Sequence, residues 1–133
     1  PSSGPVGVMA KLRKAEVLME EAAMDLEHGS YNKAVSASYF AVRLTVEHFI
    51  EGLRTTKDDK IANALFRIAE RKVGREEATR LKGTFLFLFN ERKRADHRPH
   101  LFSREEAERI VRVARSLRDE ITRILTGGTS SAE

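Results

Sequence analysis

The 133-residue sequence contains no cysteine, no tryptophan and no glutamine. Without cysteine the chain can form no disulfide, no thiolate nucleophile and no cysteine–zinc site. This composition is typical of a cytoplasmic protein. Asparagine occurs only three times while charged residues make up 33% of the chain. Because proteins of thermophiles are poor in thermolabile amides and rich in charge, the pattern also indicates a thermophilic source.

Long apolar segments are missing as well. No run approaches the ~20 apolar residues that a membrane-spanning helix needs, so we expect no membrane association. Residues 1–8 lack the charged start and apolar stretch of a signal peptide and are expected to be a disordered leader or an artificial remnant. We expect one domain over residues 9–126 and a flexible tail over residues 127–133.

The positive charge is concentrated in the second half of the chain. Residues 1–66 hold 8 Lys and Arg against 9 Asp and Glu, whereas residues 67–133 hold 16 against 11, so that the net charge is −1 in the first half and +5 in the second. A basic half favours a polyanion partner such as RNA or a nucleotide phosphate. A well-solvated helical surface explains the same numbers.

Apolar residues recur at steps of three and four through most of the chain, which predicts amphipathic helices. The predicted helices cover residues 9–28, 31–54, 60–72, 75–96 and 104–125. Gly74 separates two of them, Pro99 ends the fourth, and Ser103 with Glu106 forms a capping box for the last. No strand signal remains. The fold class is therefore all-α: an antiparallel up-and-down bundle of four to five helices, expected to dimerise through the bundle.

The run Phe85–Phe89 is the strongest apolar signal and should lie in the core. Its periodicity alone would also suit a buried strand. The flanking segments 75–81 and 91–95 are rich in helix formers, which favours a helix. The next eleven residues, 90–100, hold four Lys or Arg and two of the four histidines. One segment thus anchors itself in the core and then delivers Arg and His to the surface.

Several enzyme classes are excluded because their motifs are missing: a glycine-rich phosphate loop, His-Glu-x-x-His, an Asp-x-Asp calcium loop and a Glu-x-x-His di-iron pair. His97 and His100, with Asp96 adjacent, could in principle hold a metal. The proline between the histidines and the surrounding cations argue against it. We therefore expect no metal and no other cofactor.

Two Arg/His pairs remain, Arg92 with His97 and Arg94 with His100. Such a pair suits metal-free RNA cleavage, because histidine can transfer a proton near neutral pH and a guanidinium stabilises charge on the phosphate. Positions five apart on a regular helix differ by ~140° in direction. Arg92 and His97 can therefore meet only if the helix loosens before Pro99 or if they come from two protomers and face each other across a dimer cleft. The alternative is an ordinary i,i+4 pair of Arg92 with Asp96, with histidines that only decorate the helix end.

The combination of these segments resembles the HEPN domain family (higher eukaryotes and prokaryotes nucleotide-binding). Residues 30–41, with the adjacent Tyr39 and Phe40, resemble the second helix of the family and its aromatic pair. Residues 92–97, Arg-Lys-Arg-Ala-Asp-His, resemble its late motif, and residues 103–125 resemble its closing helix.

The resemblance implies a bundle of four to five helices that usually forms a homodimer, with the Arg/His motif in a cleft between protomers. Active members are metal-independent endoribonucleases with Arg, four to six residues, then His, and often act as toxins opposed by a small nucleotidyltransferase. By the resemblance Arg92 would stabilise the phosphate and His97 would be the general acid or base. Lys93, Arg94, Asp96 and His100 would contribute to RNA or nucleotide binding.

Two features depart from the active members. They commonly have a polar residue such as Asn or Asp directly after the motif arginine, where this chain has Lys93. A branch without apparent catalysis reads Arg-x-x-Ala-Asp-Tyr, which this chain matches except that His97 replaces the tyrosine. Three hypotheses therefore stay open. The first is a homodimer that binds RNA or a nucleotide and, in its stronger form, cleaves RNA; the second is a dimer that docks a nucleotidyltransferase; the third is a bundle whose charges serve only its solvation.

Overall fold

A computed structural model describes residues 9–50, 53 and 57–127. This part of the chain contains five α-helices and no strand, which confirms the all-α prediction. The helices are α2 (Ala10–Glu27), α3 (Tyr31–Phe49), α4 (Asp58–Val73), α5 (Arg75–His97) and α6 (Arg104–Leu125). Within the described ranges, no helix combines the length and the apolar character needed to cross a membrane.

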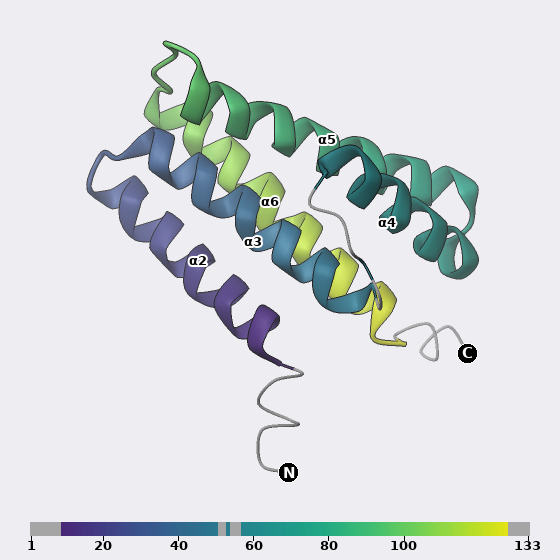
Figure 1. Ribbon diagram of the computed structural model, residues 1–133. Coiled ribbons are helices and arrows are strands. Elements are labelled where there is room, and N and C mark those ends of the chain that lie inside the picture. The colour runs from purple at the N-terminus through teal and green to yellow at the C-terminus, as the bar shows by residue number, and fades with distance from the viewer. Residues whose placement is uncertain (1–8, 51–52, 54–56, 128–133) are drawn as a thin grey trace.

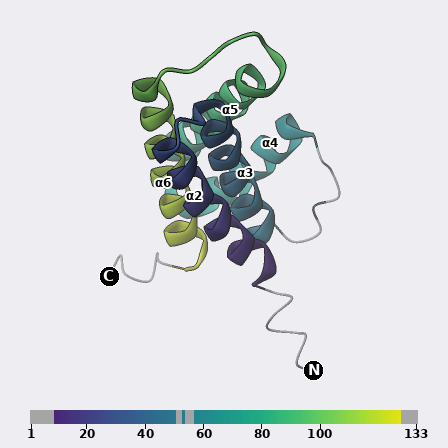
Figure 2. The ribbon, with the colours of Figure 1, turned by 90° about the vertical axis from the view of Figure 1, so that its left-hand side faces the viewer.

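Helix α3 lies at the centre of the bundle. It packs against α2, α6 and α5, while α4 and α5 form a hairpin in which α4 mainly contacts α5. Figure 1 shows α2, α3 and α6 running along one another, with the α4–α5 hairpin laid over them. The loop that joins α5 to α6 stands at one end of the bundle, and Figure 2 looks at that end.

Helix ends follow the local signals in the sequence. Helix α2 ends in a Schellman motif, with Gly29 at φ +80° and the Ser30 amide donating to the Asp25 carbonyl at 2.8 Å. Arg98, which precedes a proline, is extended at φ −118° and ψ 153°. Ser103 and Glu106 form both hydrogen bonds of the predicted capping box.

Some boundaries differ from the prediction. The second helix ends at Phe49 rather than at residue 54, because Ile50 is already extended at φ −109° and ψ 100°. Of the rest of that predicted helix, only Leu53 lies within the described residues. Ser30 occupies the N-cap position of α3, but its side chain makes no capping hydrogen bond.

The run Phe85–Phe89 is helical and only part of it reaches the core. Phe85 and Leu88 are fully buried, whereas Leu86, Phe87 and Phe89 are half-buried against the core. A helix turns by about 100° per residue, so five consecutive side chains cannot all face inward. The fully buried side chains of the main core come from α3, α4, α5, α6 and the loop residue Phe102. A smaller cluster holds α2 against α3 and against Val111 of α6.

Candidate functional site

The first two turns of α3 hold the end of α5 and the loop that follows it. Asn32 uses both amide hydrogens and its carbonyl oxygen. Its Nδ2 donates to the backbone carbonyls of Ala95 at 3.0 Å and His100 at 2.8 Å, and its Oδ1 accepts from the Phe102 amide at 3.0 Å. Phe102 is buried, at 4% exposure. One side chain therefore fixes the loop on both sides of Leu101.

One turn further along α3, Ser36 contacts the same end of α5. Its hydroxyl donates to Oδ2 of Asp96 at 3.1 Å. The same carboxylate oxygen lies 3.4 Å from Nε of Arg92, an i,i+4 ion pair on α5. The expected pairing of Arg92 with Asp96 is therefore present. Asp96 connects the arginine to α3.

The guanidinium of Arg92 is held against two aromatic rings. Its central carbon lies 4.9 Å from the centre of the Phe40 ring and 5.7 Å from that of Tyr39, distances at which cation–π attraction operates. The side chain is only 19% exposed, and its Nε is buried without a hydrogen-bond partner because the contact to Asp96 is an ion pair only. The two terminal nitrogens have no partner among residues 9–50, 53 and 57–127. Aromatic rings thus hold one face of the Arg92 guanidinium, while its terminal nitrogens remain available to a ligand.

Tyr39 is buried although its neighbours along one side of α3 are charged. Tyr39, Arg43 and Glu47 recur every four residues, a spacing that indicates a polar stripe along α3, but the ring of Tyr39 is fully buried against Phe85 and Phe89. Its hydroxyl oxygen has no hydrogen-bond partner in the described part of the chain. Arg43, from the same stripe, does form the expected pair with Glu47, at 2.9 Å.

The positive field of Arg92 extends to the start of α4. Burial raises the pKa of the Asp58 carboxyl, and the charges of Arg92 and Lys93 oppose that shift. Nζ of Lys93 also lies 4.8 Å above the Phe89 ring. Asp58 lies 3.6 Å from Arg43. A mixed cluster of charges therefore continues from the end of α5 to the start of α4.

The second Arg/His pair is in direct contact. Nη2 of Arg94 lies 3.1 Å from Nε2 and 3.3 Å from Nδ1 of His100. The guanidinium also pairs with Glu91 at 2.8 Å and lies 5.3 Å from the centre of the Phe102 ring. Because an arginine only donates hydrogen bonds, which ring nitrogen accepts from Nη2 depends on the tautomer of His100.

Glu106 completes this cluster on the α6 side. Its Oε1 lies 3.7 Å from Nε2 of His100 and also accepts from the Ser103 amide. The Ser103 amide is the main reason that the pKa of Glu106 is lowered. The loop imidazole thus lies between an arginine of α5 and a carboxylate of α6.

His97 is the last residue of α5, is exposed, and contacts no charged or aromatic side chain among the described residues. Because α5 is helical through His97, the helix does not loosen between Arg92 and His97. One protomer therefore brings Arg94 and His100 together but does not pair Arg92 with His97. No group of three or more acidic or histidine side chains suited to a metal ion occurs in the described ranges.

Sequence reasoning missed Asn32 and Ser36 as members of this site. They belong to a row on α3, Asn32, Ser36 and Phe40, whose members recur every four residues and share one face. That spacing is a signal that could have been used. We call Arg92, Lys93, Arg94, His97 and His100 together the α5 end.

Residues 8–124 match the family model described as HEPN domain. Among curated proteins, the search found no match to the chain.

Proposed function

The chain belongs to the HEPN domain family, whose members generally bind nucleotides or RNA, and from that premise we propose that it binds RNA or a nucleotide at the α5 end as a homodimer. In the stronger form of this proposal the dimer is a metal-independent endoribonuclease. It would act in the cytoplasm as the toxin of a toxin–antitoxin pair.

The observation that carries the proposal is that the guanidinium of Arg92 is held in place while its terminal nitrogens have no partner in the described part of the chain. Phe40 and Tyr39 hold its guanidinium, so little conformational entropy remains to be lost when an anion binds. Its terminal nitrogens have no partner in the described part of the chain, and they present the fork that matches a phosphate. Lys93, on the next position, adds a second cation without a carboxylate in contact. This arrangement suits a phosphodiester.

For cleavage, His97 would act as the proton-transfer group. Its unprotonated ring would take the proton of a ribose 2′-hydroxyl while that oxygen attacks the adjacent phosphorus. The 5′-oxygen would leave with a proton from a second histidine or from water, giving a cyclic 2′,3′-phosphate and a free 5′-hydroxyl. Arg92 would stabilise the charge that develops on the phosphate oxygens.

The regular geometry of α5 supports a site shared by two protomers. Arg92 and His97 point in directions that differ by ~140° on one helix, so a single phosphate cannot contact both within one protomer. Two copies of α5 facing each other would bring Arg92 of one copy near His97 of the other. The pair Arg94 and His100, already in contact within one protomer, would then bind flanking phosphate.

The catalytic form is tested by RNA cleavage in EDTA. Wild type should cleave, whereas Arg92→Ala and His97→Ala should each lose roughly a hundredfold or more of the rate. Equal cleavage by all three would indicate a contaminating nuclease and end the catalytic proposal. His48→Ala is the matched control, because it changes a half-buried histidine in the last turn of α3, at the opposite end of that helix from Asn32.

Hybrid dimers test the shared site. A dimer of one Arg92→Ala protomer with one His97→Ala protomer keeps an intact pair only if the pair forms across the interface. A dimer of wild type with a doubly substituted protomer keeps an intact pair only if the pair forms within one protomer. We expect about half of the wild-type rate from the first hybrid and almost none from the second. The reverse result would contradict the shared site.

A second candidate function is an interaction module for a small nucleotidyltransferase. Leu101 favours it, because this leucine is 87% exposed on a loop that Asn32 fixes on both sides. A rigid, exposed apolar side chain is typical of a protein contact. If a small nucleotidyltransferase is encoded beside this chain, co-expression of the two should give a complex that Leu101→Ser weakens. Absence of such a complex at micromolar concentrations would remove this candidate.

A further inference from the structure

The outer face of α6 carries a row of three arginines, Arg109, Arg112 and Arg115, which we call the α6 arginine row. All three are exposed. Residues three apart on a helix are neighbours, with Cβ atoms about 5–6 Å apart. None of the three has an ion pair or hydrogen bond within the part of the chain that the structure describes. Glu105 and Asp119, also exposed, lie on this side of α6 but form no ion pair with the row.

The other carboxylates beside the row are engaged by different arginines. Glu108 lies 3.6 Å from Arg104. Glu120 lies 2.6 Å from Arg80 of α5, which also contacts Glu77 at 2.8 Å. These ion pairs leave the three guanidinium groups of the row without a direct carboxylate partner in the described part of the chain.

The row crosses α6 between two hollows of the surface. On the α5 side, Arg109 and Arg112 line a hollow together with the hydroxyl residues Thr84 and Ser116. On the α2 side, Arg112 and Arg115 line another. Arg112 borders both hollows, so the row forms a path of arginines from one to the other over the outer side of α6. Carboxylates also line the two hollows, Glu120 in the first and Glu27 and Glu108 in the second.

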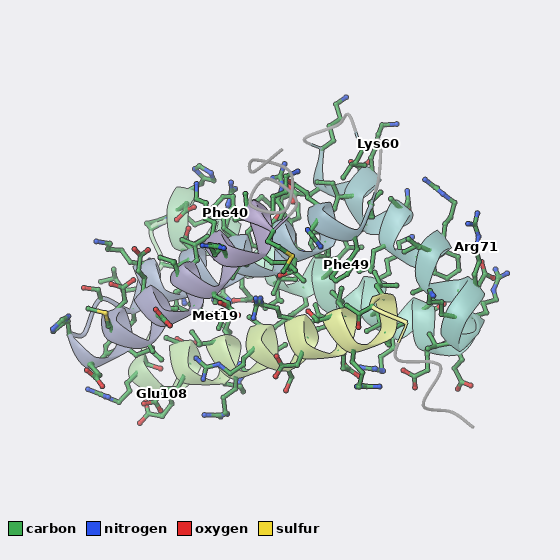
Figure 3. All side chains as sticks on the ribbon, turned by 90° about the horizontal axis from the view of Figure 1, so that it is seen from below. Met19, Phe40, Phe49, Lys60, Arg71 and Glu108 are labelled. Atoms are coloured by element: carbon green, nitrogen blue, oxygen red, sulfur yellow. The ribbon has the colours of Figure 1, made fainter. Side chains whose placement is uncertain are left out.

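This path starts close to the α5 end. His100 reaches α6 at Glu106, at 3.7 Å. With a rise of 1.5 Å per residue, Arg109 lies about 4.5 Å and Arg115 about 13.5 Å further along the helix than Glu106. Figure 3 shows Glu108, one position before Arg109, on the side of α6 that faces away from the other helices.

We propose that the α6 arginine row binds consecutive phosphates of an RNA strand whose reactive part lies at the α5 end. This inference rests on the proposed function and narrows its ligand to a single strand of several nucleotides. Unpaired guanidinium groups spaced along a surface bind backbone phosphate without reading sequence. A mononucleotide held at the α5 end is too short to span the row, whose far member Arg115 lies about 13.5 Å beyond Glu106 along the helix.

The test measures the affinity of the purified protein for two labelled single-stranded RNAs, a dinucleotide and a strand of about ten nucleotides, in EDTA at several salt concentrations. The row variant replaces Arg109, Arg112 and Arg115 by Gln. A matched variant replaces Arg67, Arg71 and Lys72 of α4 by Gln. All three are exposed and have no partner in the described ranges. Figure 3 shows Arg71 at the other end of the molecule from Glu108.

For the long strand we expect the row variant to lose roughly tenfold or more of the affinity at low salt. The slope of log affinity against log salt concentration should also become smaller by about 2, because each phosphate contact with a single strand contributes about 0.7 to it. Its affinity for the dinucleotide should be unchanged, and the α4 variant should match wild type with both ligands. Equal affinities of the row and α4 variants for the long strand would overturn the proposal, as would an equal loss for both strands. Failure of wild type to bind either RNA would instead refute the proposed function on which the row depends.

Discussion

Asn32 is the side chain on which the geometry of the α5 end most depends, and its replacement by Ala gives a worked prediction. The substitution removes three hydrogen bonds of 2.8–3.0 Å to the backbone of Ala95, His100 and Phe102. Each net bond contributes about 1 kcal/mol, and water can replace part of this at a half-buried site. We therefore expect a loss of about 2–3 kcal/mol in the free energy of unfolding.

This loss is measurable by two independent methods. For a chain of this length it corresponds to a decrease of about 7–12 °C in Tm, and to a decrease of about 1–2 M in the urea midpoint at unchanged slope. Amide exchange at Phe102 should also accelerate, because its hydrogen bond to Oδ1 is lost.

The matched control is Asn63→Ala, which changes an exposed asparagine of α4 that makes no side-chain hydrogen bond to a described residue. It should leave stability unchanged or raise it by a few tenths of a kcal/mol, because Ala is the better helix former. An Asn32→Ala variant as stable as Asn63→Ala would show that these three bonds do not hold the loop.

Two further predictions concern the core and the charge cluster. Phe85→Ala should lower the free energy of unfolding by about 3–5 kcal/mol, because it empties a fully buried site. Phe87→Ala, at a half-buried site, should lower it by less than about 2 kcal/mol in the same urea titration. Equal losses would contradict the helical orientation of the run. Burial raises the pKa of Asp58, so the stability that its protonated form contributes is full below the ordinary carboxyl pKa and is lost as the pH rises through the raised pKa. Asp58→Asn should therefore gain stability relative to wild type between about pH 3 and pH 7, and the exposed control Asp59→Asn should not. A relative loss of stability by Asp58→Asn over that range would contradict burial as the main cause.

Local signals made the helices predictable. Gly29, Pro99 and the pair Ser103–Glu106 act on the backbone within a few residues, so they can be located without knowledge of the fold. The end of α3 was predicted too late because apolar periodicity continues past Phe49, whereas the extended Ile50 has no comparable local marker.

Contacts between distant segments were less predictable. Asn32 bonds to residues 63 to 70 positions away, and no short motif identifies such a pairing. Periodicity placed Tyr39 on a polar stripe because it cannot show which helix covers a face. The path of the loop after Pro99, which brings His100 back to Arg94, likewise depends on tertiary packing. The expectations of a thermophilic source, a cytoplasmic location and a homodimer stay predictions.

The most direct test of the central proposal is the affinity of Arg92 variants for single-stranded RNA in EDTA, measured over a range of salt concentrations. Circular dichroism should first establish that each variant is folded. Arg92→Ala should weaken binding roughly tenfold or more and lower the salt slope by about 0.7, Arg92→Lys should bind with intermediate affinity, and Arg67→Ala on α4 should match wild type. Equal affinity and slope for Arg92→Ala and Arg67→Ala would contradict the assignment of the clamped guanidinium as the phosphate contact.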